Sequence, residues 1–186
     1  HPKKIWQKKK FYLAKANEQK IRHEKSDYTE YSLEPNVKTS PGGLRDIQTL
    51  QWIATRTFAT KDFMELVEKQ IISSLEYESL VEARAFLWRV RFGLHIITGR
   101  DENRLLFSHQ QSLAKHMNYH DKDQLAVEQF MKDYYIRAST VNTVNETLMK
   151  YFEEEIWEHS KNKNIIKLDT NFNIVNNLIE LSSPSA

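Results

Sequence analysis

The chain has 186 residues, of which 40% are hydrophobic and 28% charged, and its formal net charge is +2. This composition is ordinary for a soluble globular protein and argues against a wholly disordered chain. The sequence contains no cysteine, which excludes disulfides, thiolate catalysis and cysteine-ligated zinc. No apolar run approaches the roughly 20 residues that cross a bilayer, so we expect a cytoplasmic protein without membrane contact.

Turn-forming residues are scarce, with four glycines and four prolines, and strand-like alternation of apolar and polar residues is rare. These features predict an all-α fold, an antiparallel bundle of about five or six helices with one long spine helix. We expect a basic N-terminal helix in residues 1–30 that packs on or leads into the bundle. Residues 31–158 form the helical domain, and residues 159–186 form a connector with one weak element near 172–181.

The first predicted helix covers residues 3–25. Residues 1–25 hold nine Lys or Arg against two Glu, and such a basic segment can attract nucleic acid or an anionic membrane. Apolar residues from Ile5 to Ile21 instead favour a helix with one partly buried side. Because no RNA-binding or base-stacking motif accompanies the lysines, we expect no nucleic-acid binding.

The segment EPNVKTSPGGLRDI, residues 34–47, holds two of the four glycines and two of the four prolines. Each proline disfavours a helical conformation in the residue before it. Gly42 and Gly43 permit positive φ or close approach, and a helix is predicted from Leu44 to Phe58.

This segment has two interpretations. A glycine pair before a helix can present backbone N–H groups to an anion, with Lys38 and Arg45 adding positive charge, which predicts a phosphate or carboxylate cradle. Alternatively, the segment is a tight junction in which Asp46 stabilises the first helical turn and Arg45 pairs with Glu34. Local sequence features do not decide between the anion cradle and the tight junction.

A third helix is predicted from Asp62 to Ile71. The fourth is the best determined, because Ser73 and Glu76 form a capping box and Gly99 ends the apolar pattern after Thr98. Its apolar residues fall on two sides: Leu80, Ala83, Leu87, Val90 and Leu94 on one, and Val81, Ala85, Trp88, Phe92 and Ile96 on the other.

A row of Arg84, Arg91 and His95 lies between these two sides, and Arg100 follows the helix. If both sides are covered, the row faces the interior and must meet a bound anion or carboxylates such as Asp46 or Glu128.

A short helix is predicted to begin at a Ser108 cap. A long one follows an Asp121 cap and extends about 50 Å at roughly 1.5 Å per residue. Its apolar stripe comprises Val127, Phe130, Met131, Tyr134, Ala138, Val141, Leu148, Phe152 and Ile156. His120-Asp121 matches part of a metal-dependent phosphohydrolase signature, but as a helix cap Asp121 needs no metal, and we expect no metal site.

Three blocks, EPNVKTSPGGLRDIQTLQWIA, FLWRVRFGLHIITGRDENRLLF and VEQFMKDYY, resemble the segment after the nucleotidyltransferase core of bacterial protein-PII uridylyltransferase/uridylyl-removing enzymes. The resemblance covers about residues 10–157. It implies a full enzyme with a nucleotidyltransferase domain, this helical domain, an HD phosphohydrolase domain and two glutamine-sensing ACT domains. That enzyme transfers UMP from UTP to a tyrosine of the PII protein, with Mg2+.

The chain lacks the Gly-Ser turn and paired aspartates of the transferase and a complete set of HD ligands. We therefore expect a support domain for nucleotide and substrate, inactive alone and binding no cofactor tightly. Residues 159–186 would lead toward the HD domain. The alternative is an interdomain module that relays glutamine sensing without touching nucleotide.

The resemblance also suggests site residues. Glu34 would be a catalytic carboxylate, carried by an extended segment at the edge of the transferase active site. The expected nucleotide-binding residues are Asn36, Lys38, Gly42, Gly43, Arg45 and Asp46. Residues expected to be structural or anion-facing are Arg84, Arg91, His95 and Arg100.

Overall fold

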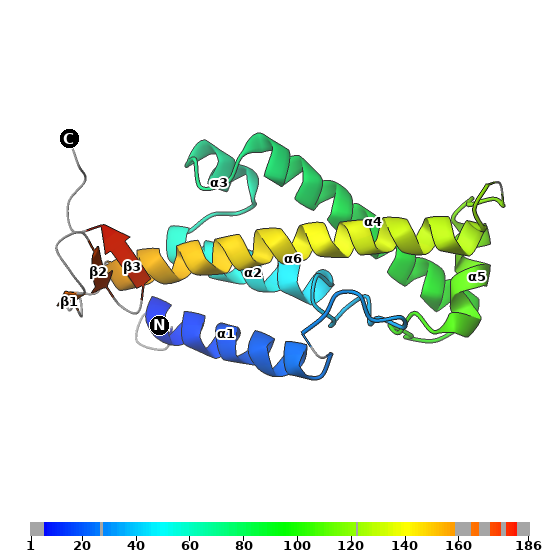
Figure 1. The fold of residues 1–186 in the computed structure, drawn as a ribbon, viewed down its shortest axis with the longest axis horizontal. Coiled ribbons are helices and arrows are strands. Elements are labelled where there is room, and N and C mark those ends of the chain that lie inside the picture. The colour runs from blue at the N-terminus through cyan, green and yellow to red at the C-terminus, as the bar shows by residue number, and fades with distance from the viewer. Residues whose placement is uncertain are drawn as a thin grey trace.

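The computed structural model describes residues 6–26, 28–121, 123–158, 165–167, 172–175 and 178–181. It confirms the helical bundle (Figure 1). The described residues contain six helices: α1 (Lys8–Glu24), α2 (Leu44–Phe58), α3 (Met64–Glu68), α4 (Ser74–Thr98), α5 (Phe107–His116) and α6 (Ala126–Glu158). None of them is long and apolar enough to span a bilayer.

Helix α6 is the spine of the bundle. Its 33 residues span roughly 50 Å, and it packs against α1, α2, α4 and α5. Figure 1 shows α1 and α2 running beside it on one side, α4 crossing it on the other, and α5 at the far end. Most of its predicted apolar stripe is fully buried, including Phe130, Leu148 and Phe152.

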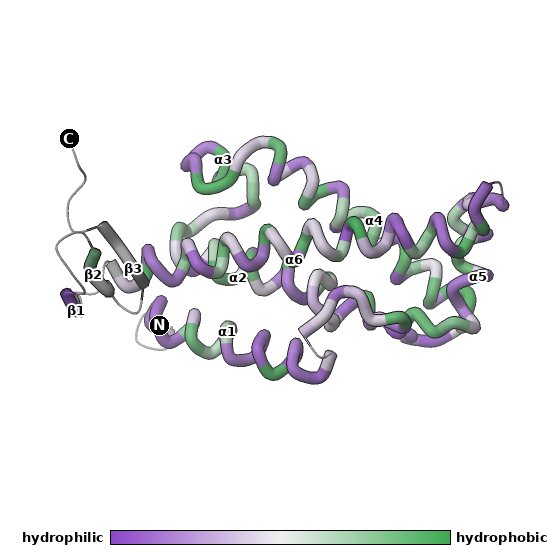
Figure 2. The backbone as a smooth tube through the Cα atoms, in the orientation of Figure 1, coloured by the Kyte–Doolittle hydropathy of each residue, from purple (hydrophilic) through white to green (hydrophobic). Residues whose placement is uncertain are grey.

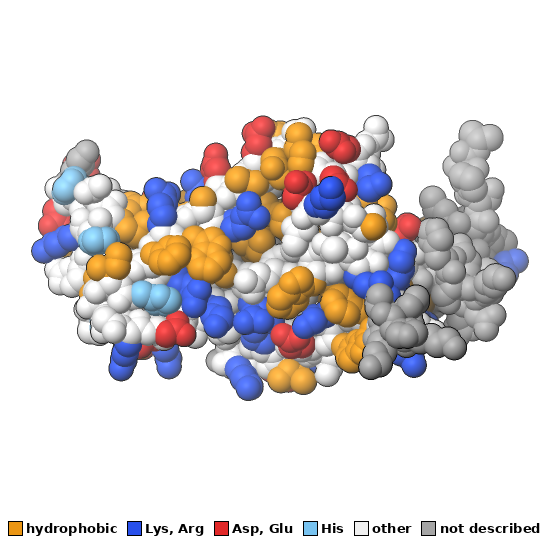
Figure 3. Space-filling view, turned by 180° about the vertical axis from the view of Figure 1, so that it is seen from behind, with side chains coloured by type: hydrophobic (Ala, Val, Ile, Leu, Met, Phe, Trp, Pro, Cys, Tyr) orange, Lys and Arg blue, Asp and Glu red, His pale blue; other side chains and the backbone are white. Residues whose placement is uncertain are grey.

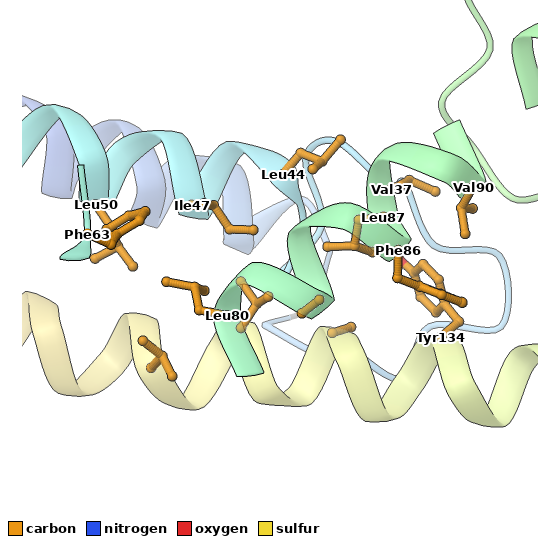
Figure 4. Close-up of a cluster of buried hydrophobic side chains, with 14 of the residues drawn as sticks. Val37, Leu44, Ile47, Leu50, Phe63, Leu80, Phe86, Leu87, Val90 and Tyr134 are labelled. Atoms are coloured by element: carbon orange, nitrogen blue, oxygen red, sulfur yellow. The ribbon is translucent and has the colours of Figure 1, made fainter. Parts of the chain in front are cut away.

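The core lies where α2, α4 and α6 meet. Figure 4 shows Val37 from the loop before α2, Leu44 from α2, Leu87 from α4 and Tyr134 from α6 converging on it. Hydrophobic positions recur along the inward sides of these helices, whereas hydrophilic positions dominate α1 (Figure 2). Burial of this apolar surface is the main force that holds the helices together.

Two predicted helices have the expected bounds. Helix α2 runs from Leu44 to Phe58. In α4 the Ser73 hydroxyl accepts from the Glu76 N–H and the Glu76 carboxylate accepts from the Ser73 N–H, so the capping box is confirmed. Gly99 ends α4 in a left-handed conformation with φ +65°.

The other boundaries need correction. Helix α1 is described from Lys8, and residues 3–5 of the predicted helix lie outside the described residues. Helix α3 is only five residues long. Ser108 lies inside α5 instead of capping it. Helix α6 begins at Ala126, and the predicted cap Asp121 accepts from the Ala126 N–H at 2.8 Å.

Three short strands follow the bundle: β1 (Ile165–Lys167), β2 (Phe172–Val175) and β3 (Leu178–Leu181). They form an antiparallel sheet in the order β1-β2-β3, with Ile174 opposite both Ile166 and Ile179. The sequence predicted one weak element near 172–181, so the first strand was missed. The rest of the predicted connector lies outside the described residues.

Candidate functional site

The glycine pair allows the loop before α2 to touch α6 directly. Gly42 has φ +73°, and a Cβ at this position would lie 2.1 Å from the carbonyl oxygen of Ala138. At Gly43 a Cβ would lie 2.8 Å from the Ser40 carbonyl oxygen. Both contacts are too short for a side chain, so the special backbone of this segment reflects the close approach of Gly42 to the spine helix and the tight turn of the loop on itself at Gly43.

The backbone N–H groups at the start of α2 are already used within the loop. The N–H of Gly42 donates to Asp46 Oδ2 at 2.8 Å, and that of Gly43 donates to the Ser40 carbonyl at 2.9 Å. Leu44 and Arg45 donate to the Val37 and Lys38 carbonyls. With these partners the loop has the geometry of a tight junction, and its side chains, instead of its backbone, are free to meet an anion.

Asp46 is the centre of this junction and is fully buried. Besides the Gly42 N–H, its carboxylate accepts from Gln19 Nε2 at 3.0 Å and pairs with Arg22, and it lies 3.0 Å from His23 Nε2. All three side chains belong to α1. Four groups thus share one carboxylate, which satisfies the requirement that a buried charge be paired and hydrogen-bonded.

The polar network also reaches α6, because Gln19 Nε2 donates to Asn145 Oδ1 at 2.9 Å. It therefore joins α1, α2 and α6 at one point. Sequence analysis anticipated a partly buried side on α1 but did not identify Gln19, Arg22 or His23. Their polar character in a lysine-rich helix resembles that of a solvated face, so no local signal distinguishes them.

Glu34 lies at the start of α5. Its Oε1 accepts from the Phe107 N–H at 2.9 Å, and its Oε2 is 4.0 Å from Arg104 Nη2. A carboxylate at a helix N-terminus satisfies an otherwise unpaired N–H and interacts favourably with the helix dipole. Glu34 has no ion pair with Arg45 among the described residues, so that part of the junction hypothesis is wrong.

Asn36 shapes the turn that follows. Its Oδ1 accepts from the N–H groups of Lys38 and Thr39 at 3.1 and 3.0 Å. This arrangement is a local turn stabilised by an Asn side chain. The Asn36 carboxamide oxygen is therefore engaged with its own loop.

The row on α4 lies at the surface. Phe92 and Ile96 are 58% and 68% exposed, so the second apolar side of α4 is uncovered in this chain. Because this apolar side of α4 is uncovered, Arg84, Arg91 and His95 are not forced into the interior. Its partners are residues of the loop after α4, not Asp46 or Glu128 as the sequence suggested.

Those partners are specific. Arg91 Nε donates to Asn103 Oδ1 at 2.7 Å, and its Nη2 lies 3.3 Å from Asp101 Oδ1. His95 Nε2 lies 3.1 Å from the same oxygen, although its alignment is not that of a hydrogen bond. Arg100 pairs with Glu102 at 2.8 Å.

The structure brings Lys38 close to this row. The pKa of Asp101 is lowered, first by its hydrogen bond from Asn103 and then by the positive charges of Arg91, His95 and Lys38. Several cations thus surround one exposed carboxylate. The surface keeps an excess of positive charge next to the aromatic ring of Trp88, over which the Arg91 guanidinium lies at 5.2 Å.

Arg45 is half-buried beside Trp52, with its guanidinium 5.8 Å from the ring centroid. Its Nε is buried without a hydrogen-bond acceptor, and no ion pair of Arg45 is present among the described residues. Arg84 is exposed and also has no ion pair there. We call Lys38, Arg45, Arg84 and Arg91 the basic face.

Figure 3 shows Lys and Arg side chains interleaved with hydrophobic ones across the middle of one side of the bundle. Mixed basic and aromatic surfaces bind phosphate-bearing ligands and also protein partners. Within the described ranges, no three His, Asp or Glu side chains lie close enough to hold a metal ion.

Comparison with known proteins bears on this site. The family model described as GlnD PII-uridylyltransferase matches residues 10–149. A bifunctional uridylyltransferase/uridylyl-removing enzyme of Stutzerimonas stutzeri is 44% identical over 182 residues, which cover 97% of this chain and 20% of the relative. The enzyme of that name from Nitrosococcus oceani is 44% identical over 99% of this chain and 21% of its own length. A third, from Aliivibrio fischeri, is 40% identical over the whole chain and 21% of its own length.

The chain therefore spans about a fifth of the length of the curated relatives that it matches. No solved structure matches it.

Proposed function

The chain belongs to the GlnD PII-uridylyltransferase family, and from this premise we propose that it is the helical support domain of a PII uridylyltransferase. In the full-length enzyme a separate nucleotidyltransferase domain would transfer UMP from UTP to the PII protein. The helical domain would pack against that domain and help to bind nucleotide and substrate. An HD domain would follow in the same protein, which would act in the cytoplasm in nitrogen regulation.

The observation that carries this proposal is Arg45, which makes no ion pair among the described residues, although, after the hydrogen bond from Lys15, its charge helps to lower the pKa of Glu18 from a longer distance. A half-buried guanidinium whose Nε has no hydrogen-bond acceptor is costly unless an anion complements its charge. Phosphate oxygens are strong acceptors for guanidinium N–H groups. Lys38 and Arg91 add positive charge on the same face, so the triphosphate of UTP is the ligand that this face fits.

The contribution of the domain would be electrostatic. Positive charges held in place before the reaction stabilise negative charge that develops on the leaving phosphates, without reorganisation in the transition state. The rigid junction at Asp46 and the contact of Gly42 with α6 hold Arg45 and Lys38 in position. Mg2+ would be held by the substrate phosphates together with carboxylates that the nucleotidyltransferase domain would supply.

A second candidate function is favoured by the uncovered side of α4. Exposed Phe92 and Ile96, with Trp88 stacked on Phe92 at 5.6 Å, form an apolar surface of the kind that packs against another domain. In this case the domain relays the state of glutamine-sensing domains to the catalytic ones and does not touch nucleotide.

The test is Arg45→Ala in the full-length enzyme. If the basic face contacts the triphosphate, the KM for UTP should rise about tenfold, which corresponds to about 1.4 kcal/mol. The melting temperature should change little, because Arg45 makes no ion pair that the substitution would break. Arg137→Ala is the matched control, since Arg137 pairs with Glu82 on the surface of the bundle at 3.3 Å.

The outcomes separate the candidates. An unchanged KM for UTP with an altered response to glutamine would support the interdomain module. A large fall in melting temperature together with the loss of activity would assign Arg45 to sealing the domain interface. Equal effects of Arg45→Ala and Arg137→Ala would contradict a specific nucleotide contact.

A further inference from the structure

A polar groove of about 600 Å3 lies between α1 and α6, which run side by side (Figure 1). Its size falls in the range of small-molecule sites. Its lining comes from residues 12–28 and 142–153 and includes none of the basic-face residues Lys38, Arg45, Arg84 and Arg91. The groove is therefore separate from the surface on which the proposed function rests.

Two carboxamides, those of Gln19 and Asn145, form part of the wall, although these residues are only 6% and 4% exposed. Asp46 fixes how both are oriented. An ionised carboxylate only accepts hydrogen bonds, so the Gln19 atom that faces it must be Nε2, and the Asn145 atom that faces Nε2 must be the acceptor Oδ1. This chain of bonds leaves the Gln19 Oε1 acceptor and the Asn145 Nδ2 donor without a partner among the described residues.

These two unused atoms open into the groove. Neither belongs to the described side-chain atoms that are both sealed from solvent and unpaired, so each keeps some accessible surface. Both residues line the groove, and the 2.9 Å bond from Gln19 Nε2 to Asn145 Oδ1 holds their carboxamides next to each other. The groove therefore offers a donor and an acceptor close together, which complements a ligand with an amide-like edge.

Tyr28 adds an aromatic ring to the lining, just beyond the end of α1. It is 56% exposed, and its phenol donates to Glu24 at 2.8 Å. Its backbone has φ +53°, which is rare for a bulky residue, and its N–H donates to the His23 carbonyl at 3.0 Å. Strained residues of this kind cluster at binding sites, where the surrounding structure holds them in place. An exposed ring in a fixed position is a surface on which a planar ligand can stack.

The charges that line the groove are balanced. Lys20 and Lys150 are exposed and form no ion pair within the described part of the chain. Glu146 and Glu153 lie in the same groove, and His23 is held by the buried carboxylate described above. Two glutamates beside two lysines repel a phosphate about as much as the lysines attract it, so the lining favours an uncharged ligand.

We propose that this groove binds the base of a nucleoside, with Asn145 Nδ2 donating to its hydrogen-bonding edge, Gln19 Oε1 accepting from that edge, and the ring lying against Tyr28. Each nucleobase carries a donor and an acceptor side by side on its edge, and bases stack favourably on aromatic side chains. The inference does not depend on the proposed function, because the groove and the basic face share no residue.

The probes are uridine and adenosine, added to the full-length protein with isotopically labelled methionine methyl groups. Met149 lines the groove, and its NMR signal, assigned by its loss in Met149→Leu, should shift during the titration. Met64 in α3 lies outside the groove, and its signal should not move. A shift with either nucleoside supports the proposal, and the one that acts identifies the ring.

N3-methyluridine tests the edge, because its methyl group replaces the N3–H donor and leaves the rest of the ring in place. Its half-saturating concentration should be about tenfold higher than that of uridine, since Gln19 Oε1 loses its donor. Asn145→Asp is the matching change in the protein, because it keeps the Oδ1 that Gln19 needs and removes the NH2 group. It should abolish the shift of the Met149 signal.

Tyr28→Asn tests the stacking surface, because Asn tolerates a positive φ and carries no ring. It should raise the half-saturating nucleoside concentration about fivefold. Tyr28→Phe is the matched control, since it keeps the ring, loses only the bond to Glu24, and should bind as the wild type does. If Asn145→Asp does not fold, the Tyr28 pair and N3-methyluridine still decide the matter.

Three results would overturn the proposal. The first is an unchanged Met149 signal at millimolar concentrations of both nucleosides. The second is equal half-saturation by uridine and N3-methyluridine, and the third is equal weakening of binding by Tyr28→Asn and Tyr28→Phe. Because Met149 reports on this groove alone, the proposal can fail while the Arg45→Ala test of the proposed function succeeds, and the reverse.

Discussion

Gly42 carries a tighter steric constraint than Gly43, the other glycine in the loop before α2. It combines a positive φ of +73° with a carbonyl oxygen of α6 only 2.1 Å from where a Cβ would lie. Gly99 has a similar φ of +65° but no atom within 4 Å of that position. A comparison of Gly42 with Gly99 therefore separates the energetic cost of a strained backbone from the cost of a steric clash.

Gly42→Ala should destabilise the protein by about 3 kcal/mol or more, because the strained φ and the clash with the Ala138 carbonyl add together. Gly99→Ala should cost only about 1 kcal/mol, from the left-handed backbone alone. Urea unfolding of both variants measures the two free energies. Equal losses would show that the loop can move away from α6 without penalty.

At the scale of an element, the start of α4 links sequence and stability most directly. The pKa of Glu76 is lowered, first by the hydrogen bond from the Ser73 backbone N–H and then by the bond from its hydroxyl. A carboxyl whose pKa is lower in the folded protein stabilises the fold when it is ionised. Its contribution is present above the unfolded pKa, near 4.5, and disappears as the pH falls through the folded value.

Ser73→Ala should reduce the free energy of unfolding by about 1 kcal/mol at pH 7. Glu76→Gln should also destabilise the protein at pH 7, and this difference from the wild type should shrink toward pH 3. Denaturant titrations at the two pH values test the sign. A difference that grows on acidification would contradict the capping role of the carboxylate.

For the whole molecule, the network around Asp46 decides how α1 is held. Asp46 and Gln19 are 27 residues apart, and Gln19 and Asn145 are 126 residues apart, yet hydrogen bonds join all three. Lysines of α1 contribute as well, since Lys8 donates to the Thr57 carbonyl and Lys9 lies 4.4 Å from the Trp157 ring centroid. The basic N-terminal helix is thus an integral part of the bundle.

Asp46→Asn should destabilise the protein by about 3 to 5 kcal/mol, because it leaves the buried Arg22 guanidinium without a counter-charge. Hydrogen exchange in residues 8–24 should accelerate, since α1 loses its main polar attachment. Glu154→Gln is the control, because Glu154 is exposed and carries the same charge. Equal stabilities of the two variants would show that α1 is held by its apolar contacts alone.

Much of the fold could be predicted from local patterns. The apolar periodicity of α4 and α6, the Ser73 capping box and the Gly99 stop are each encoded within one or two helical turns, where neighbouring residues decide the energy. The Ser108 cap was wrong because the N–H group of Phe107 is satisfied by Glu34, which is 73 residues away. A cap supplied from such a distance leaves no trace in the local sequence.

Local sequence patterns are enough to predict a helical bundle with an unusual segment at residues 34–47 and a basic first helix. Only in the folded chain is it settled which groups meet: Asp46 pairs with α1, and the α4 row lies at the surface. The two kinds of feature differ in how far apart in the sequence the interacting residues lie. Helix formation depends on residues three or four positions apart, whereas the pairing of a buried charge depends on how separate helices pack.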